Sequence, residues 1–391
     1  MNVIHLSCWY PQPDKPNYGL YIRQQVQALT ELAKIDGSKH VLAAVVVGPG
    51  KASFQSSLRY LDPDSDGVRG AIVEIRTRFW KMLYNNPPFL LQQFRQLYRH
   101  VADGLNPDLI HAHISYPCGV VARQLARQLK LPYIISDHWL ALKRHLQVHP
   151  LRHMTYKAMM GAQAIIVPTT FMKQELAKAS VKHQLPKLVV VPPTVDTSVY
   201  HYKPKTQHNQ LHLVALAPLL KSKRLELLID AVAELEAQNI PCRLTVIGTG
   251  SHQSNLEGRS FDHHAPVRFV GRQTRKQIAT HLLDADAVLM ASSYETYGPY
   301  LAEALSTGTP VLATNLPIWQ DIIAPGFGEL VEPTVADWVV KIKGLLSMQY
   351  QHETIAQFAA IRYSPTSVAQ LLAAAQESAV QNFDQDTTHK S

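Results

Sequence analysis

Two acidic side chains in one short stretch are the clearest candidates for chemistry in this sequence. Glu295 and Glu303 are separated by seven residues and follow the apolar run at 287–291. If a helix begins near Pro299, the first carboxylate lies on a strand-to-helix loop and the second about one turn inside the helix. The free N–H groups and the positive dipole end of such a helix favour a diphosphate. Carboxylates accept hydrogen bonds from hydroxyls, so we expect Glu303 on a ribose and Glu295 on a sugar.

The backbone between the two carboxylates suits the close approach of a ligand. Gly298 permits a tight turn, and Pro299 fits the first helical position because its missing N–H would be unpaired there. Pro299 also removes one donor near the phosphates, whereas Gly298 and Tyr300 keep theirs, and Tyr297 completes the expected contacts. The alternative is a stretch without a ligand, in which the first carboxylate is a solvated loop acid and the second only balances the helix dipole.

The elements that must position these residues alternate between strand and helix along the chain, which is typical of parallel βαβ units. A stretch rich in turn formers, 192–207, divides the chain. We therefore expect an α/β protein with domains at 1–200 and 201–361, followed by a helix and an unstructured polar tail at 362–391. The loops after the strands are where ligand sites are expected. The predicted strands include 41–47, 109–111, 133–136, 164–168, 188–191, 211–217, 243–247, 267–270, 287–291 and 311–313, and the predicted helices include 21–32, 120–129, 225–236 and 301–306.

An ordered series of motifs over nearly the whole chain resembles the retaining glycosyltransferase family 4. The series comprises Glu295-x7-Glu303 with 308–314, the segments 243–250, 267–272, 326–331 and 362–364, and, in the first half, Tyr10-Pro11, 19–22 with Gln25, 111–119, 132–138 and 192–196. The resemblance implies the GT-B fold, with two Rossmann-like domains facing across a central cleft. It also implies that the last helix returns to the first domain.

The resemblance implies an enzyme that moves a sugar from a nucleotide-diphosphate donor to a glycan or lipid-linked acceptor, with retention, in cell-surface polysaccharide synthesis. A metal-independent hexosyltransferase without a cofactor is expected. The broken bond leaves negative charge on the diphosphate, which a Lys/Arg pair stabilises in the family, and Lys223 falls on that lysine. The expected catalytic residues are Glu295, Lys223 and His138, and the expected substrate-binding residues are Glu303, Gly298, Pro299, Tyr300, Tyr297, Gly19, Gly248, Arg272, Lys221 and Arg224.

One departure from the family pattern keeps other functions open. Pro218 stands where the family has the arginine, and Ala217 where it has the preceding glycine. Either Lys221 or Arg224 reaches the diphosphate instead, or the enzyme is slow or inactive; the basic run can also be a solvated helix start. A non-catalytic partner subunit or sugar-nucleotide-binding protein of the same fold is therefore an alternative, as is a sugar-nucleotide epimerase. A dehydrogenase is a weaker rival because no Gly-x-Gly-x-x-Gly follows the first strand.

Three metal-like patterns do not lead us to expect a required metal. The string at 62–67 mimics a calcium loop, but Val73 stands where that loop needs a glutamate. Asp284-Ala285-Asp286 is expected to cap a helix-to-strand junction. His111 and His113 are expected to lie on one strand, with one side chain packed inward and the other facing the cleft.

Composition limits the class of protein and its location. The chain has 391 residues and a formal charge of +8, without an apolar run that could span a bilayer. The first residues lack the pattern of a signal peptide, so a cytoplasmic location is expected, at the inner face of the membrane where the acceptor is a lipid. Nucleic-acid motifs are missing, and no nucleic-acid partner is expected. The three cysteines have neither disulfide nor zinc spacing and are expected to be buried or incidental.

The segment 76–84 interleaves basic and aromatic residues, and Arg95 and Arg99 follow it. This pattern fits an interfacial helix at a membrane. A packed helix whose cations extend past apolar surface fits equally well.

Overall fold

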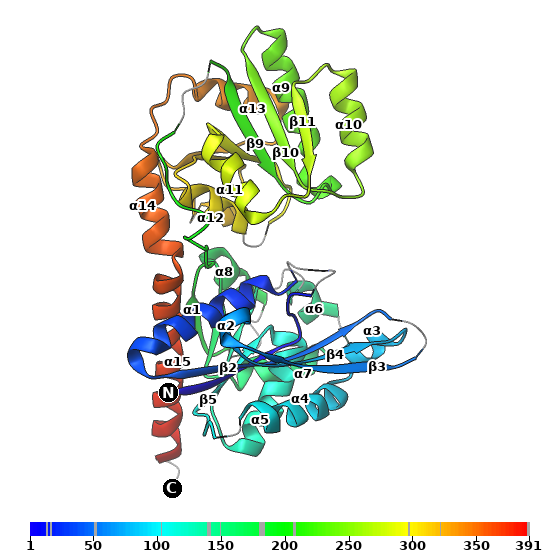
Figure 1. Cartoon of the computed structure of the whole chain (residues 1–391), viewed down its shortest axis with the longest axis vertical. Helices are drawn as coiled ribbons and strands as arrows, with labels where there is room; N and C mark the ends of the chain where they lie inside the picture. The colour runs from blue at the N-terminus through cyan, green and yellow to red at the C-terminus, as the bar shows by residue number, and fades with distance from the viewer. Residues whose placement is uncertain are drawn as a thin grey trace. The chain divides into compact units, whose positions relative to one another are not determined.

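The computed structural model describes residues 1–12, 15, 18–50, 53–102, 104–138, 142–148, 150–179, 184–205, 209–295, 298–320 and 322–388. The chain forms two compact units (Figure 1). Unit 1 comprises Met1–Thr194 and Pro365–Ser391, and unit 2 comprises Val195–Ser364. The chain enters unit 2 earlier than at the predicted residue 201 because the Val195 N–H donates to the Tyr363 carbonyl at 2.8 Å.

The described sheet of unit 1 has eight strands in the order β3-β4-β2-β1-β5-β6-β7-β8. Its strands are parallel except for β3, which pairs with β4 in the antiparallel sense. The central strands are buried over almost their whole length, as expected of a parallel sheet covered on both faces. The strands are β1 (Asn2–Ser7), β2 (Lys39–Gly48), β3 (Gln55–Leu61), β4 (Arg69–Arg76), β5 (Leu109–His113), β6 (Tyr133–Ser136), β7 (Ala164–Val167) and β8 (Lys187–Val190).

Helices cover both faces of this sheet because alternate strand residues point to opposite sides. On one side Val3 packs with Leu29 of α1 and Leu372 of α15. On the other side Ile4 belongs to a cluster that includes Phe94 of α4. The helices are α1 (Leu20–Asp36), α2 (Pro63–Asp66), α3 (Trp80–Tyr84), α4 (Pro87–Val101), α5 (Val120–Leu129), α6 (Leu142–Val148), α7 (Arg152–Met160), α8 (Thr170–Ala179) and α15 (Pro365–Thr388), with a turn η1 (Ser115–Gly119) before α5.

Two predictions about unit 1 are wrong. The segment 76–84 is not one helix, because Arg76 ends β4, α3 begins only at Trp80, and a proline pair starts the separate helix α4. Asn86 caps α4 by accepting a hydrogen bond from the Phe89 N–H at 3.1 Å. The predicted unstructured tail is helical as far as it is described, since α15 continues to Thr388.

Unit 2 has a fully parallel sheet, whose six described strands follow the order β11-β10-β9-β12-β13-β14. Numbered within the unit this is 3-2-1-4-5-6, the order of dinucleotide-binding domains, which reverses between β9 and β12. The strands are β9 (Leu211–Leu216), β10 (Cys242–Ile247), β11 (Val267–Gly271), β12 (Ala287–Met290), β13 (Val311–Thr314) and β14 (Gly328–Val331). The helices are α9 (Leu225–Ala237), α10 (Gln253–Asp262), α11 (Arg275–Asp284), α12 (Pro299–Ser306), α13 (Val335–Gly344) and α14 (His352–Tyr363), with short turns η2 (Lys221–Lys223) and η3 (Pro317–Trp319).

Candidate active site

The point where the strand order of unit 2 reverses brings together Lys223 and Glu295. The two residues lie on the loops after β9 and β12, the neighbouring strands at which ligand sites of such sheets form. The Lys223 ammonium donates to the Glu295 carboxylate, which also accepts from the Ser292 hydroxyl at 2.8 Å. The side chains are only 16% and 12% exposed. The pair is therefore a partly buried charge pair at a predicted ligand-binding edge.

The two loops are held to each other by hydrogen bonds to backbone carbonyls. Ser293 donates its N–H to the Ser222 carbonyl at 2.8 Å, and Arg224 donates from its guanidinium to the Ser292 carbonyl at 3.2 Å. Arg224 is thus engaged in holding the loop that carries Glu295. Lys221, by contrast, is exposed. Within the described part of the chain, Lys223 is the one of these three basic residues that pairs with a predicted site carboxylate.

The loop after β9 is also supported from the neighbouring loop after β10. Leu219 donates its N–H to the Thr249 carbonyl at 3.1 Å. Gly248 has φ +140°, and a Cβ at this position would lie 2.0 Å from the Ala217 carbonyl oxygen. Gly248 therefore allows the loop after β10 to pack closely against Ala217, which begins the loop that leads to Lys223. The side chain of Pro218 is exposed on this loop.

Helix α12 begins at Pro299, as predicted, and its entry is shaped by packing. Gly298 precedes it in the left-handed region with φ +52°, and a Cβ there would lie 2.4 Å from the buried Trp319 ring. The next residue, Tyr300, has a raised pKa, chiefly through burial and then through the charges of Glu303 and Glu295. Tyr300 thus lies within electrostatic reach of both carboxylates. Tyr297 lies outside the described residues.

Glu303 lies in a second polar cluster of unit 2 that the sequence did not reveal. Burial raises the pKa of Glu303 to about 7, against the opposing effects of Arg275 and a hydrogen bond from Tyr200. Arg275 donates to the Asp196 carboxylate at 3.0 Å and lies over the Tyr200 ring at 5.5 Å from its centroid. The Oε2 atom of Glu303 has no hydrogen-bond partner among the described residues. Asp196 belongs to the motif at 192–196, whereas no sequence pattern indicated a role for Tyr200 or Arg275.

Two predicted residues of unit 1, Gly19 and His138, lie near the start of helix α1. Gly19 precedes the helix with φ +71°, and a Cβ there would lie 2.6 Å from the Trp9 backbone. The Tyr21 ring packs against His138, with centroids 4.5 Å apart. Burial lowers the pKa of His138 to about 3, so this imidazole is neutral at physiological pH. A neutral ring can donate one hydrogen bond and accept one.

The last substrate-binding prediction, Arg272, lies away from the reversal point. It follows β11, the edge strand of the sheet, and its side chain is exposed.

The two acidic segments that resemble metal sites, 62–67 and 284–286, have structural roles. Asp62 caps α2 by accepting from the Asp64 N–H at 2.9 Å. Asp286 accepts from the His212 N–H at 2.7 Å.

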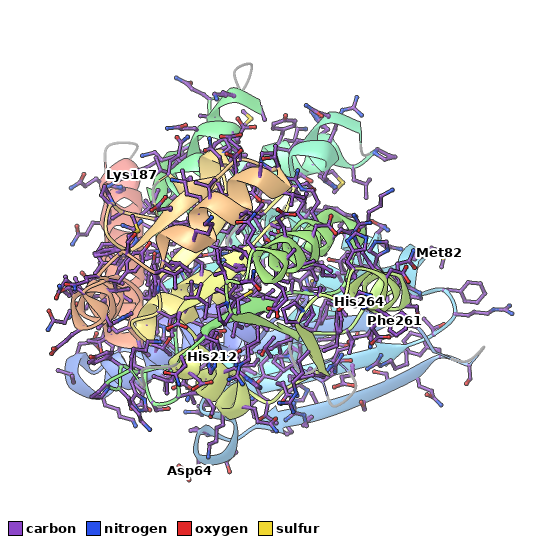
Figure 2. The ribbon with its side chains drawn as sticks, turned by 90° about the horizontal axis from the view of Figure 1, so that it is seen from above. Asp64, Met82, Lys187, His212, Phe261 and His264 are labelled. Atoms are coloured by element: carbon purple, nitrogen blue, oxygen red, sulfur yellow. The ribbon has the colours of Figure 1, made fainter. Side chains whose placement is uncertain are left out.

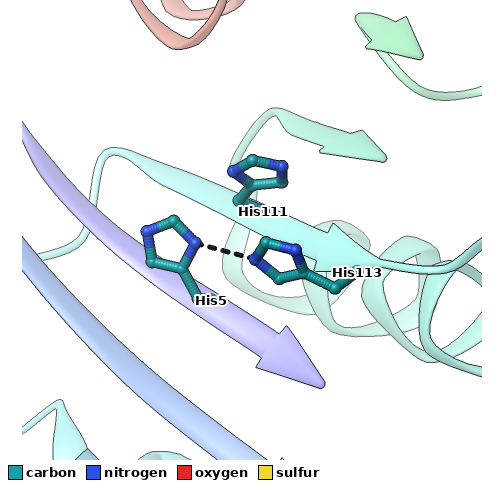
Figure 3. A group of neighbouring side chains, drawn as sticks. All are labelled: His5, His111 and His113. Atoms are coloured by element: carbon teal, nitrogen blue, oxygen red, sulfur yellow. Dashed lines mark hydrogen bonds between the residues drawn. The ribbon is translucent and has the colours of Figure 1, made fainter. Parts of the chain in front are cut away.

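The interpretation of His111 and His113 is wrong in one respect. Residues two apart on a strand point to the same face, and both side chains are fully buried together with His5 of the paired strand β1 (Figure 3). His5 Nδ1 lies 3.1 Å from His113 Nε2, and His5 Nε2 lies 3.1 Å from His40 Nδ1. His111 contacts the Ser136 hydroxyl and the Gln376 amide. One nitrogen from each of His5, His111 and His113 falls within 4.8 Å of the others, close enough to hold a metal ion, but these ring nitrogens are mostly engaged in hydrogen bonds.

The histidine cluster predicts acid sensitivity. Burial lowers the pKa of His111 to about 3 and of His40 to about 4, and it also lowers the pKa values of His5 and His113 well below the ordinary value. Below about pH 6.5 the unfolded chain binds protons that the folded chain does not. We therefore expect the unfolding free energy to fall by about 1.4 kcal/mol per pH unit and per neutral histidine as pH falls from 6.5 toward 4.5.

Urea unfolding at several pH values measures this slope. The variant His40→Gln removes one titrating group and should reduce the slope by about one proton. A flat profile for the natural chain over this range would contradict the prediction.

Comparison with known proteins decides the family. Residues 197–362 match the family described as "Glycosyl transferases group 1", and residues 46–199 match the one described as "Glycosyltransferase Family 4". The chain belongs to the group 1 glycosyltransferases of family 4. The expected GT-B fold is also confirmed. Each unit of this family 4 glycosyltransferase has a largely parallel sheet covered by helices, which makes it a Rossmann-like domain.

Curated relatives of this family 4 glycosyltransferase are distant. It is 29% identical over 208 residues to the uncharacterized glycosyltransferase YqgM of Bacillus subtilis, covering 51% of this chain and 56% of the relative. It is 21% identical to the alpha-monoglucosyldiacylglycerol synthase of Streptococcus pneumoniae, covering 61% and 60%. It is 23% identical to the putative teichuronic acid biosynthesis glycosyltransferase TuaC of Bacillus subtilis, covering 91% and 90%. The chain thus spans only between half and two thirds of the first two relatives.

Solved structures share the fold over the full length of this glycosyltransferase. Sucrose-phosphate synthase of Thermosynechococcus elongatus aligns with a TM-score of 0.70 at 16% identity, covering 100% of both chains. Anabaena HepE in complex with UDP aligns with a TM-score of 0.72 at 15% identity, covering 97% of this chain and 100% of that one. Among the described residues, no helix has the length and hydropathy to cross a membrane.

Proposed function

We propose that this chain is a retaining glycosyltransferase that moves a sugar from a nucleotide-diphosphate donor to a glycan or lipid-linked acceptor. The observation that carries the proposal is the Lys223–Glu295 pair at the strand-order reversal of unit 2, next to the start of α12. HepE, which shares the fold, was solved with UDP and with UDP-glucose, which supports a UDP-type donor. A role in cell-surface polysaccharide synthesis is supported by the likeness to TuaC.

The charge pair suits the main electrostatic task of glycosyl transfer. As the bond between the anomeric carbon and phosphate breaks, negative charge grows on the diphosphate. Lys223 supplies a fixed cation, which Glu295 and Ser292 hold in place. The N–H groups at the start of α12 supply further positive potential. In same-face attack the departing phosphate oxygen takes the acceptor proton, so this chain needs no separate nucleophile, and we propose that it needs no metal.

The second cluster suits the ribose of the donor. In its ionised form Glu303 can accept hydrogen bonds from two neighbouring hydroxyls, and its Oε2 atom is unpaired among the described residues. Because burial raises the pKa of Glu303 to about 7, the carboxylate becomes the better acceptor as pH rises from 6 to 8. Neutral His138 of unit 1 is proposed to contact a sugar hydroxyl.

Thermal stabilisation by nucleotides tests the donor site. We expect UDP, GDP or ADP, or one of their sugars, to raise the melting temperature by mass action, more strongly at pH 8 than at pH 6. Glu303→Ala should abolish most of the rise. Glu257→Ala is the matched control, because this exposed glutamate of α10 lies in the same unit and bonds only Gln253 among the described residues. A rise that survives in Glu303→Ala would remove Glu303 from the donor site.

Pro218 is the observation that favours a second function, a non-catalytic partner subunit that binds a sugar nucleotide. Proline stands where the family has the arginine, and the nearby Arg224 is engaged in a hydrogen bond to the Ser292 carbonyl. Slow hydrolysis of the bound donor in the absence of acceptor would favour the enzyme. Nucleotide binding without hydrolysis, with activity appearing only after a second chain is added, would favour the partner subunit. Interconversion of two sugar nucleotides would instead identify an epimerase.

We propose a cytoplasmic location, with the edge of unit 1 in contact with the inner face of the membrane. The exposed apolar residues Phe79 and Met82 lie beside the exposed cations Arg78 and Lys81, and Arg78 lies 4.5 Å from the centroid of the Phe79 ring. We call these four residues the α3 patch; helix α3 lies near the edge strand β3 and its neighbour β4 (Figure 1). Apolar side chains beside cations are typical of binding to anionic lipid.

Replacing Phe79 and Met82 together by serine should lower the fraction of protein that sediments with vesicles containing anionic lipid, since apolar insertion is lost. Phe261→Ser is the control because Phe261 is 78% exposed and Met82 61%, yet Phe261 lies in unit 2 (Figure 2). Equal sedimentation of all three proteins would contradict a role for the patch.

A further inference from the structure

Two cysteine side chains that are 110 positions apart in the sequence meet in unit 1. The Sγ atoms of Cys8 and Cys118 lie 2.9 Å apart, and both residues are buried. Cys8 directly follows β1, and Cys118 lies in the turn η1 after β5. These strands are paired neighbours, in which Ser7 is opposite His113. The sequence contained no sign of this contact because the sheet alone brings the two loops together.

We propose that Cys8 and Cys118 form a thiol–disulfide pair, which a low-molecular-weight disulfide of the glutathione type can oxidise. A disulfide requires sulfurs about 2.05 Å apart, so the atoms must approach by only about 0.9 Å. Both residues lie in loops beyond the strand ends, where a small rotation does not break the sheet.

The reaction is a pair of thiol–disulfide exchanges. The sulfur of one cysteine, as thiolate, attacks the small disulfide, forms a mixed disulfide and releases one small thiol. The second cysteine then attacks the protein sulfur of that mixed disulfide and releases the second small thiol. Two protein thiols lose two hydrogens, and one small disulfide becomes two thiols. The low-molecular-weight disulfide is therefore the only oxidant required.

The surroundings of the pair set its rate and its effect. Burial raises the pKa of the Cys118 thiol well above its ordinary value, so exchange with the folded protein is slow and requires local opening. Tyr18, Tyr84 and Tyr116 all lie within electrostatic reach of Cys8. The bridge would therefore tie together the loops around the start of α1, close to Gly19, and would restrict the unfolded chain over a long loop.

The third cysteine provides an internal control. Cys242 lies in unit 2 at the start of β10, and its Sγ atom is 3.9 Å from the Val232 carbonyl oxygen. Both units contain a buried cysteine, but only unit 1 has a second sulfur in contact within the described residues. Oxidation should therefore spare Cys242.

The test uses the full chain, both as the folded protein exposed to oxidised glutathione and as protein refolded in a glutathione redox buffer. After unfolding and alkylation, peptide mass mapping should find Cys8 linked to Cys118 and Cys242 alkylated, with the link reversed by dithiothreitol. The oxidised form should melt at a higher temperature than the reduced form. Cys118→Ser and Cys8→Ala should each abolish the link and the temperature difference, while Cys242→Ser should retain both.

Three alkylated cysteines after both treatments would overturn the proposal. So would a stable mixed disulfide of glutathione on Cys8 or Cys118, because the neighbouring thiol should resolve it. Linkage that involves Cys242 would show non-specific oxidation and would also overturn it.

Discussion

Replacing Lys223 by glutamine is expected to slow turnover of the nucleotide-sugar donor about 100- to 1,000-fold, the size of effect seen when one charge-stabilising group is removed from a transition state. Glutamine keeps a donor for Glu295 but removes the positive charge. Because Lys223 is the only basic residue of its turn that pairs with a site carboxylate among the described residues, its neighbours do not replace it. Turnover is measured as release of the nucleotide from the donor found in the thermal screen.

A matched control separates this local effect from a change in the charge of the whole unit. Lys276→Gln removes a charge from α11 in the same unit, where the side chain is exposed, and should leave turnover unchanged. If Lys223→Gln turned over the donor as fast as the natural chain, the leaving-group cation would have to lie elsewhere. Loss of turnover in both variants would point to a general electrostatic effect.

Replacing Gly248 by alanine should destabilise unit 2 by about 3 kcal/mol or more. The new Cβ would lie 2.0 Å from the Ala217 carbonyl oxygen, and the backbone has φ +140°, which side chains rarely adopt. Overlap and backbone strain of this kind are among the few mechanisms that produce large losses. Because Ala217 begins the loop that carries Lys223, donor turnover should fall as well.

Gly258→Ala is the control for this substitution. Gly258 lies inside α10, and a Cβ there meets no atom within 4 Å. Alanine favours a helix interior over glycine by about 0.5–1 kcal/mol, so this variant should be slightly more stable. Denaturant unfolding compares the two variants. Equal stability of Gly248→Ala and the natural chain would show that the loop after β9 can move without cost.

Local patterns predicted those parts of the molecule that local chemistry determines. The strand 133–136 and the helix 120–129 have the predicted bounds, and α12 begins at Pro299 because proline suits the first helical turn. The prediction of a helix over 76–84 is wrong because the basic and aromatic pattern resembled that of a helix, whereas Arg76 is paired in β4. The GT-B fold was predicted through the ordered motifs and is confirmed.

Contacts between distant segments could not be predicted in the same way. The approach of Tyr200 and Arg275 to Glu303 depends on how the segment entering unit 2 lies against α11 and α12, which no spacing encodes. The histidine cluster depends on β1 lying beside β5, and only the shared face of His111 and His113 was available from strand periodicity. The roles of the site residues remain predictions that the variants above test.

The route of the chain through its two units makes them unequal under truncation. Unit 2 is an insertion: it starts at Val195 and ends at Ser364, and its ends are tied by the bond from Val195 to Tyr363. Residues 195–364 therefore form one continuous segment of the chain. Unit 1 is different, because Val368 and Leu372 of α15 pack in its core beside Val3. A premature stop after unit 2 would therefore remove part of the core of the unit that was synthesised first.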